Sequence, residues 1–146
     1  MNILVVTRDR VTLFILKEFL EEKGDNVFDI KTLTAKEIEK LVKTENIELL
    51  LIDLFLKEEE HKYPKDSDFT SVKFVNKVLK TDDDIKVAFM TNELNINNSI
   101  FHNKFKDIDQ NWLLIHKSDI NFIKDRDCFY NQLLLLTPSI PNIKYA

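Results

Sequence analysis

The chain has 146 residues, a net charge of −4, one cysteine and one glycine. This length fits a single domain, and the acidic balance argues against a broad basic surface for nucleic acid. The single cysteine and glycine exclude an internal disulfide framework, a cysteine-rich zinc site and the glycine-rich loops that cradle phosphates. The sequence shows no signal peptide and no apolar run near the roughly 18–20 residues of a membrane span. We therefore expect a cytoplasmic protein that does not enter a membrane.

Five short aliphatic runs predict β-strands. Two of them, 3–6 and 47–52, are nearly continuous in Ile, Leu and Val, which is typical of strands buried on both faces of a parallel sheet. The segment 27–33 instead alternates apolar and polar residues. The expected strands are 3–6, 27–33, 47–52, 85–90 and 112–115.

Segments with helical spacing lie between these strands. Gly24 directly follows the helix expected at 9–23, where the residue after a helix often needs a positive φ. Thr34 and Glu37 form a capping box for a second helix. The apolar stripe expected in the first helix comprises Val11, Phe14, Ile15, Glu18 and Phe19, and that in the second Ile38, Leu41 and Val42. The other expected elements are a loop at 57–68 and helices at 69–80, 92–110 and 119–136.

The alternation of strand and helix predicts an α/β fold, a (βα)₅ doubly wound parallel sheet with helices on both faces. We expect one domain over 1–146, with its core in 2–136 and an irregular tail at 137–146. In such sheets, chemistry is located outside the carboxyl ends of the strands. Three polar residues are expected at these ends, and they would bring a carboxylate, a hydroxyl and an ammonium to one edge. They are Asp53, Thr91 and Lys117.

These residues and their flanking strands resemble the receiver domain of two-component response regulators. The matching pieces are ILVV at the start, LLLIDLFL around Asp53, VAFMT ending at Thr91 and LLIHK ending at Lys117, and the resemblance covers roughly residues 2–136. It implies a flavodoxin-like, five-stranded sheet of order 2-1-3-4-5. It further implies that Asp53 accepts a phosphoryl group from a kinase phosphohistidine, that Thr91 binds that group and that Lys117 pairs with it. A carboxylate is a competent nucleophile for this transfer, and a fixed cation stabilises its charge.

The resemblance also implies Mg²⁺, held by an acidic pair after the first strand, the phosphoacceptor and a backbone carbonyl two residues beyond it. This chain has Thr7 and Arg8 in place of the pair, so only Asp9 and Asp53 remain as carboxylate ligands. Mg²⁺ prefers carboxylate and water oxygens, and arginine offers none. We therefore expect no cofactor, with Mg²⁺ on Asp9 and Asp53 as the alternative, and an N-cap role for Asp9. We expect the Arg8 guanidinium to lie toward Asp53 and replace the metal's charge, against the alternative that it extends into solvent.

Other positions depart from the receiver pattern. Lys57 and Ser118 stand where the family has prolines, and Leu114 stands where it has a switch aromatic. The loop after Asp53 is also longer than the family norm. These departures weaken both the active site and the output switch, so the chain resembles a degenerate receiver, or pseudo-receiver.

The remaining chemistry-bearing side chains have ordinary interpretations. Cys128 lies in the last expected helix without a paired base nearby in the sequence, so we expect a buried thiol and not a nucleophile. Glu93 is expected to be an exposed loop charge. The histidines lack the spacing of metal ligands and are expected to be surface or packed residues: His61, His102 and His116.

Three functions follow as hypotheses. The first is a stand-alone receiver-like protein, without a fused output domain, that acts by protein–protein contact with weak or absent phosphorylation of Asp53. Its expected partner is a sensor histidine kinase or another signalling protein, and the sequence leaves open whether it forms a homodimer. The second is a working phosphoacceptor whose only catalysis is its own phosphorylation. The third is an unrelated flavodoxin-like domain that binds a small ligand.

Overall fold

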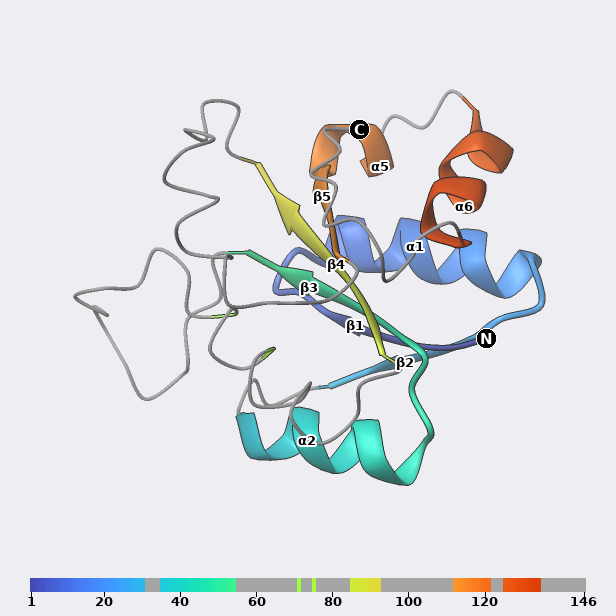
Figure 1. The fold of residues 1–146 in the computed structure, drawn as a ribbon. Helices are drawn as coiled ribbons and strands as arrows, with labels where there is room; N and C mark the ends of the chain where they lie inside the picture. Colours follow the sequence, from blue (N-terminus) through green and yellow to red (C-terminus); the bar gives the residue numbers. More distant parts are fainter. Residues whose placement is uncertain are drawn as a thin grey trace.

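The computed structural model describes residues 1–30, 35–54, 71, 75, 85–92, 112–121 and 125–134. Five strands form one sheet, in which all neighbours run parallel and the order is β2-β1-β3-β4-β5 (Figure 1). The predicted α/β class and strand order are confirmed. The strands are β1 (Asn2–Val6), β2 (Asn26–Asp29), β3 (Leu49–Asp53), β4 (Lys86–Thr91) and β5 (Trp112–His116).

Helices cover both faces of the sheet (Figure 1). Successive strand residues point to opposite faces, so Leu4 and Val6 enter one core while Ile3 and Val5 enter the other. The first core is closed by α2, and the second by α1, α5 and α6. The aliphatic runs form the central strands because both of their faces are buried. The helices are α1 (Arg10–Glu22), α2 (Ala35–Thr44), α5 (Lys117–Asn121) and α6 (Arg126–Leu134).

The ends of α1 are set by local hydrogen bonds. Asp9 is the N-cap, and its side chain accepts from backbone N–H groups of the first turn, so its predicted capping role is confirmed. Gly24 has a φ of 90°. Its N–H donates to the carbonyl of Glu21, and the N–H of Asp25 donates to the carbonyl of Leu20. This is the helix-ending motif in which glycine avoids the strain of a positive φ, as the sequence predicted.

The predicted buried stripe of α1 is wrong in part: Phe19 is buried as expected, but other members of the stripe are not. Val11 and Phe14 are 61% and 68% exposed. A polar residue, Thr12, occupies the buried face, where its hydroxyl donates to Asn121 Oδ1 at 3.1 Å. Apolar spacing alone does not identify a buried threonine, so the stripe expected from it is rotated away from the buried face of the helix. The buried residues of α1 are Thr12, Leu16, Phe19 and Leu20.

The helix expected at 119–136 is two helices. Asp125 accepts a hydrogen bond at its Oδ1 from the backbone N–H of Cys128, at 3.0 Å, and thereby starts α6 as a separate helix. This restart turns Phe129 and Leu133 toward the core. Cys128 is exposed, so the expected buried thiol is also wrong.

Other predictions are tested only in part. β2 ends at Asp29, earlier than expected, whereas Ile38 and Val42 are buried as predicted. Ser71 and Val75 are helical and buried, in agreement with a helix around them. Within the described segments, no helix is long and apolar enough to cross a membrane. The predictions that lie outside the described residues concern Thr34, the loop 57–68, the segment 93–110, the tail, Lys57, His61, Glu93 and His102.

Candidate functional site

Polar side chains gather where the parallel strands end. Asp53 is the last residue of β3 and Thr91 is the last residue of β4. Thr7 directly follows β1, and Lys117 directly follows β5 as the first residue of α5. None of the four is more than 8% exposed. The predicted strand-end residues therefore do come to one edge of the sheet, together with Thr7.

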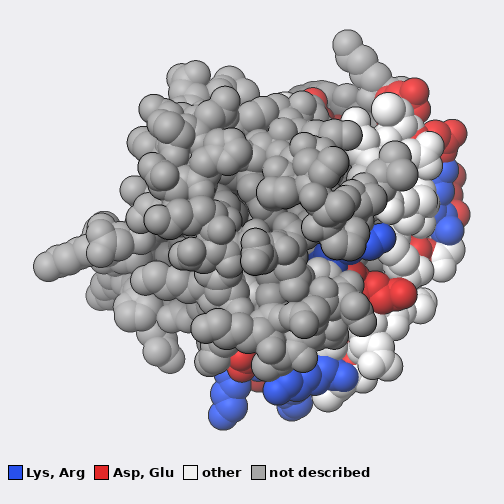
Figure 2. Space-filling model, viewed as in Figure 1, with Lys and Arg blue, Asp and Glu red and all other residues white. Residues whose placement is uncertain are grey.

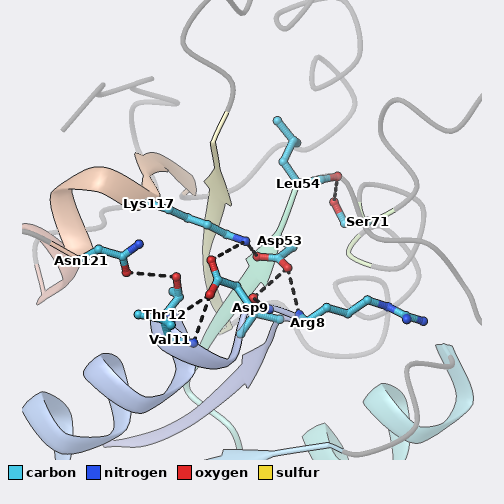
Figure 3. Close-up of polar contacts among 10 residues, drawn as sticks. Arg8, Asp9, Val11, Thr12, Asp53, Leu54, Ser71, Lys117 and Asn121 are labelled. Carbon is cyan, nitrogen blue, oxygen red and sulfur yellow. Dashed lines mark hydrogen bonds and ion pairs between the residues drawn. The ribbon is translucent and has the colours of Figure 1, made fainter.

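The Asp53 carboxylate is held by three groups of the chain (Figure 3). Its Oδ1 lies 2.9 Å from the Lys117 ammonium nitrogen. Its Oδ2 accepts hydrogen bonds from the Thr7 hydroxyl at 2.8 Å and from the Arg8 backbone N–H at 3.2 Å. A buried carboxylate is tolerated only with such compensation, because an unpaired buried charge is very costly. The negative charge of Asp53 is thus balanced from within the chain.

Thr7 links the two aspartates of the site. Its hydroxyl donates to Asp53 and accepts a hydrogen bond from the Asp9 backbone N–H at 3.0 Å. In the sequence, Thr7 stands out only as the loss of an acidic residue, and this linking role was not predicted. The available signal was a hydroxyl placed directly after a buried strand, next in the sheet to the strand that ends in Asp53.

The Asp9 carboxylate faces both the helix and Lys117 (Figure 3). Its Oδ1 accepts from the backbone N–H groups of Val11 and Thr12, at 3.1 and 3.2 Å. Its Oδ2 lies 3.8 Å from the Lys117 nitrogen. Partial burial acts to raise the pKa of Asp9. The hydrogen bonds from Thr12, with the Lys117 charge and the Val11 N–H, outweigh burial and lower that pKa below its ordinary value.

The Arg8 guanidinium does not lie toward Asp53, contrary to the prediction from the sequence. The Arg8 side chain is exposed and points away from Asp53, and only its backbone N–H contacts that carboxylate (Figure 3). Thr7, the residue before it, is the one whose side chain points at Asp53, so the expectation for Arg8 is wrong.

The structure gives the positions of two further predicted residues, Thr91 and Leu114, but does not test their functions. Thr91 is 2% exposed at the same edge, and its contact with a transferred phosphoryl group remains a prediction. Leu114 is fully buried in the core that α2 covers. A leucine in that position has no polar end that could alternate between buried and exposed states, as a tyrosine's can.

The described donors do not fit a divalent cation. Asp9 and Asp53 are the carboxylates at this edge, and both face the Lys117 ammonium. Nowhere in the described part of the chain do three or more His, Cys, Asp or Glu side chains form a cluster that could hold a metal ion. Mg²⁺ requires near-octahedral oxygen ligands, and at this edge an ammonium already pairs with the two carboxylates.

Known proteins were compared with the chain by sequence and by structure. No protein-family model and no curated protein matches it. Solved structures do match. The receiver domain protein (CheY-like) of Methanospirillum hungatei JF-1 is 22% identical, with 91% of this chain and 90% of that chain covered at a TM-score of 0.58. A two-component response regulator from Clostridium difficile is 18% identical, with 93% and 94% covered at 0.63.

A third match extends the same picture. The N-terminal domain of a response regulator/sensory box/GGDEF protein from Carboxydothermus hydrogenoformans is 16% identical, with 93% of both chains covered at a TM-score of 0.65. The chain has the receiver fold. Asp53 is the last residue of β3 in this fold, as the resemblance in sequence implied. The likeness concerns the scaffold.

Proposed function

We propose that the chain is a receiver-like signalling module that acts by protein–protein contact, with weak or absent phosphorylation of Asp53. The observation that carries the proposal is that the Asp53 carboxylate is already paired with groups of the chain itself. The hydrogen bonds from Thr7 and the Arg8 backbone use both acceptor sites of Asp53 Oδ2, and Oδ1 is paired with Lys117, so attack on phosphorus weakens part of this pairing. Each of these bonds to a charged group stabilises the resting carboxylate by about 1.5–3 kcal/mol. The resting site therefore opposes the chemistry that its scaffold supports in other proteins.

The proposed partners are a sensor histidine kinase or another signalling protein. Figure 2 shows Lys and Arg atoms at the lower edge, where α2 lies, beside acidic atoms. The sequence of α2 alternates the two signs, with Lys36, Lys40 and Lys43 among Glu37 and Glu39. Interspersed charge of this kind suits a protein partner better than a polyanion such as nucleic acid. A cytoplasmic location accords with this role and remains a prediction.

The experiment is incubation with Mg²⁺ and a small acyl phosphate, read by intact mass. We expect little or no gain of one phosphoryl group in the wild type. Asp53→Asn provides the background, since it removes the acceptor oxygen at the same size. Near-complete phosphorylation of the wild type that Asp53→Asn abolishes would show that the resting contacts do not restrain the site and would contradict the proposal.

A working phosphoacceptor is the second candidate, favoured by the close approach of Lys117 to Asp53 and by Thr91 at the same edge. In that reaction an Asp53 oxygen forms a bond to phosphorus while the bond from phosphorus to the donor histidine nitrogen breaks. The nitrogen keeps the electron pair, and Lys117 compensates the charge on the phosphoryl oxygens. The mass experiment, repeated with a phosphorylated kinase as donor, decides between the two candidates.

The third candidate, a small-ligand domain, gains little support. A cavity of about 360 Å³ lies beside α2, and its lining mixes charged and apolar residues with one threonine: Asp29, Glu37, Lys40 and Glu45, then Ile30 and Leu41, and Thr44. Small-molecule pockets are lined predominantly by apolar and aromatic side chains. The matching structures reported above are receivers, which supports a receiver-like function over a small-ligand domain.

A further inference from the structure

We propose that the site binds no divalent cation because the chain supplies its own: the Lys117 ammonium, held between Asp53 and Asp9, occupies the cation's place, and Thr7 removes the need for a metal. This inference concerns metal binding alone. It holds or fails whether or not Asp53 is phosphorylated and whether or not a kinase is the partner.

Every carboxylate oxygen of the two aspartates already faces a positive or hydrogen-bonding group. Asp53 Oδ1 faces Lys117, and Asp53 Oδ2 accepts from Thr7 and Arg8. Asp9 Oδ1 accepts from the backbone N–H groups of the second and third residues of α1, and Asp9 Oδ2 faces Lys117. A metal that took either aspartate would have to displace these donors and lie close to an ammonium. Repulsion between like charges is strong in a buried site, where the effective dielectric constant is low.

Lys117 cannot readily move aside. Its side chain is only 8% exposed, and it is the first residue of α5, which packs against α1 through the Thr12 to Asn121 hydrogen bond. Its ammonium lies 2.9 Å from one carboxylate and 3.8 Å from the other. Because a buried charge must remain paired, a metal that displaced Lys117 from Asp53 would leave that ammonium without its closest partner.

Position 7 decides which cation the site needs. The 2.8 Å bond from the Thr7 hydroxyl shows that this side chain points at Asp53 Oδ2. A carboxylate on the same stem would face the Asp53 carboxylate, and one ammonium would no longer balance the negative charge. A hydroxyl instead donates a proton to Asp53, so Lys117 suffices. The prediction is that Thr7→Asp alone creates a demand for a divalent cation.

The test is a titration with Mn²⁺, read as paramagnetic broadening of backbone amide signals in two-dimensional NMR. In the wild type we expect no selective broadening at Arg8, Asp9 and Leu54. In Thr7→Asp we expect selective, saturable broadening at these amides. We also expect an affinity for Mn²⁺ at least roughly tenfold higher than any affinity of the wild type. Thr44→Asp, the same substitution at an exposed position of α2, is the matched control and should behave as the wild type.

Saturable broadening around Asp53 in the wild type would overturn the proposal, and so would a folded Thr7→Asp that gains no affinity. If Thr7→Asp does not fold, Lys117→Gln replaces it. Lys117→Gln removes the internal cation, so Mn²⁺ should bind to this variant and raise its melting temperature. The melting temperature of the wild type should not change with Mn²⁺. A Lys117→Gln protein that Mn²⁺ does not stabilise would also overturn the proposal. The mass experiment on Asp53 is separate, so failure of the proposed function would leave these results unaltered.

Discussion

Two aspartates are buried at opposite edges of the sheet, and each is held by one cation and one hydroxyl. At the carboxyl edge, Asp53 pairs with the Lys117 ammonium and accepts from a threonine hydroxyl. At the amino edge, Asp25 pairs with the amino group of Met1 at 2.7 Å and accepts from the Tyr130 hydroxyl at 2.6 Å. They are 6% and 7% exposed. The two sites therefore share one cation and one hydroxyl, and Asp53 also accepts from the Arg8 backbone N–H.

The difference lies in what each network joins. The Asp25 network ties the end of α1 to the start of β1 and to α6, and it serves the packing of the second core. The Asp53 network lies where four strands end, and there one ammonium serves two carboxylates. A buried, ion-paired aspartate is thus not by itself a sign of function. Its place at the carboxyl edge of a doubly wound sheet is the informative feature.

The largest expected effect comes from removing the cation at the carboxyl edge. Lys117→Met should lower the free energy of unfolding at pH 7 by about 3–5 kcal/mol, because it leaves Asp53 buried without its counter-charge. Adding Asp53→Asn should restore part of this loss. Urea denaturation measures both, with Lys17→Met on the exposed face of α1 as the control. A loss below about 1 kcal/mol would place Lys117 among ordinary surface pairs.

Removing the hydroxyl at the amino edge should have an intermediate effect. Tyr130→Phe should cost about 1.5–3 kcal/mol, since its hydroxyl bonds a charged carboxylate, while the ring contact with Phe19 at 6.0 Å is kept. Thr7→Val is the matched variant at the other edge and should cost a similar amount. If only one of the two variants lost stability, the two networks would not be equivalent in energy.

The pH dependence of Tyr130 sharpens this comparison. Burial, together with the hydrogen bond and charge of Asp25, raises the pKa of Tyr130 from 10.0 to about 12. The unfolded chain therefore releases this proton first, so the stabilisation is complete below pH 10 and is lost as the pH rises toward 12. Ultraviolet titration of the wild type minus Tyr130→Phe isolates this group. A difference spectrum that titrates at pH 10 would contradict the Asp25 contact.

Asp9 should contribute a smaller amount, mainly as a cap. Asp9→Ala should cost about 1 kcal/mol, whereas Asp9→Asn should cost less because asparagine caps equally well. The lowered pKa of Asp9 means that its contribution is present above its ordinary value of 3.8 and is lost as the pH falls through the lower folded value. The free energy of unfolding should therefore depend less on pH in the acid range in Asp9→Asn than in the wild type. Equal losses in both variants would assign the effect to charge and not to capping.

Most of the sheet could be predicted from the sequence because buried parallel strands have an unmistakable composition. Val5 and Leu51 lie in such runs, and the alternation with helices then brought Asp53 and Lys117 to one edge. The face of α1 could not be predicted, because the buried Thr12 depends on its bond to Asn121, 109 positions away along the chain. Long-range polar contacts of this kind have no periodic signature.

The smallest expected effect belongs to Arg8, the second cation of the carboxyl edge. Arg8→Ala should change the free energy of unfolding by less than about 0.5 kcal/mol, because Asp53 is contacted by the backbone N–H, which alanine retains. The guanidinium is exposed, and ionic contacts of exposed side chains contribute little to stability. The sequence could not show this. An arginine at position 8 is compatible with a contact to Asp53 through its side chain or through its backbone N–H, and the residue type does not distinguish the two. A loss above about 1 kcal/mol in urea denaturation, weakened by salt, would restore the guanidinium as a partner of the site and reduce the special place of Lys117.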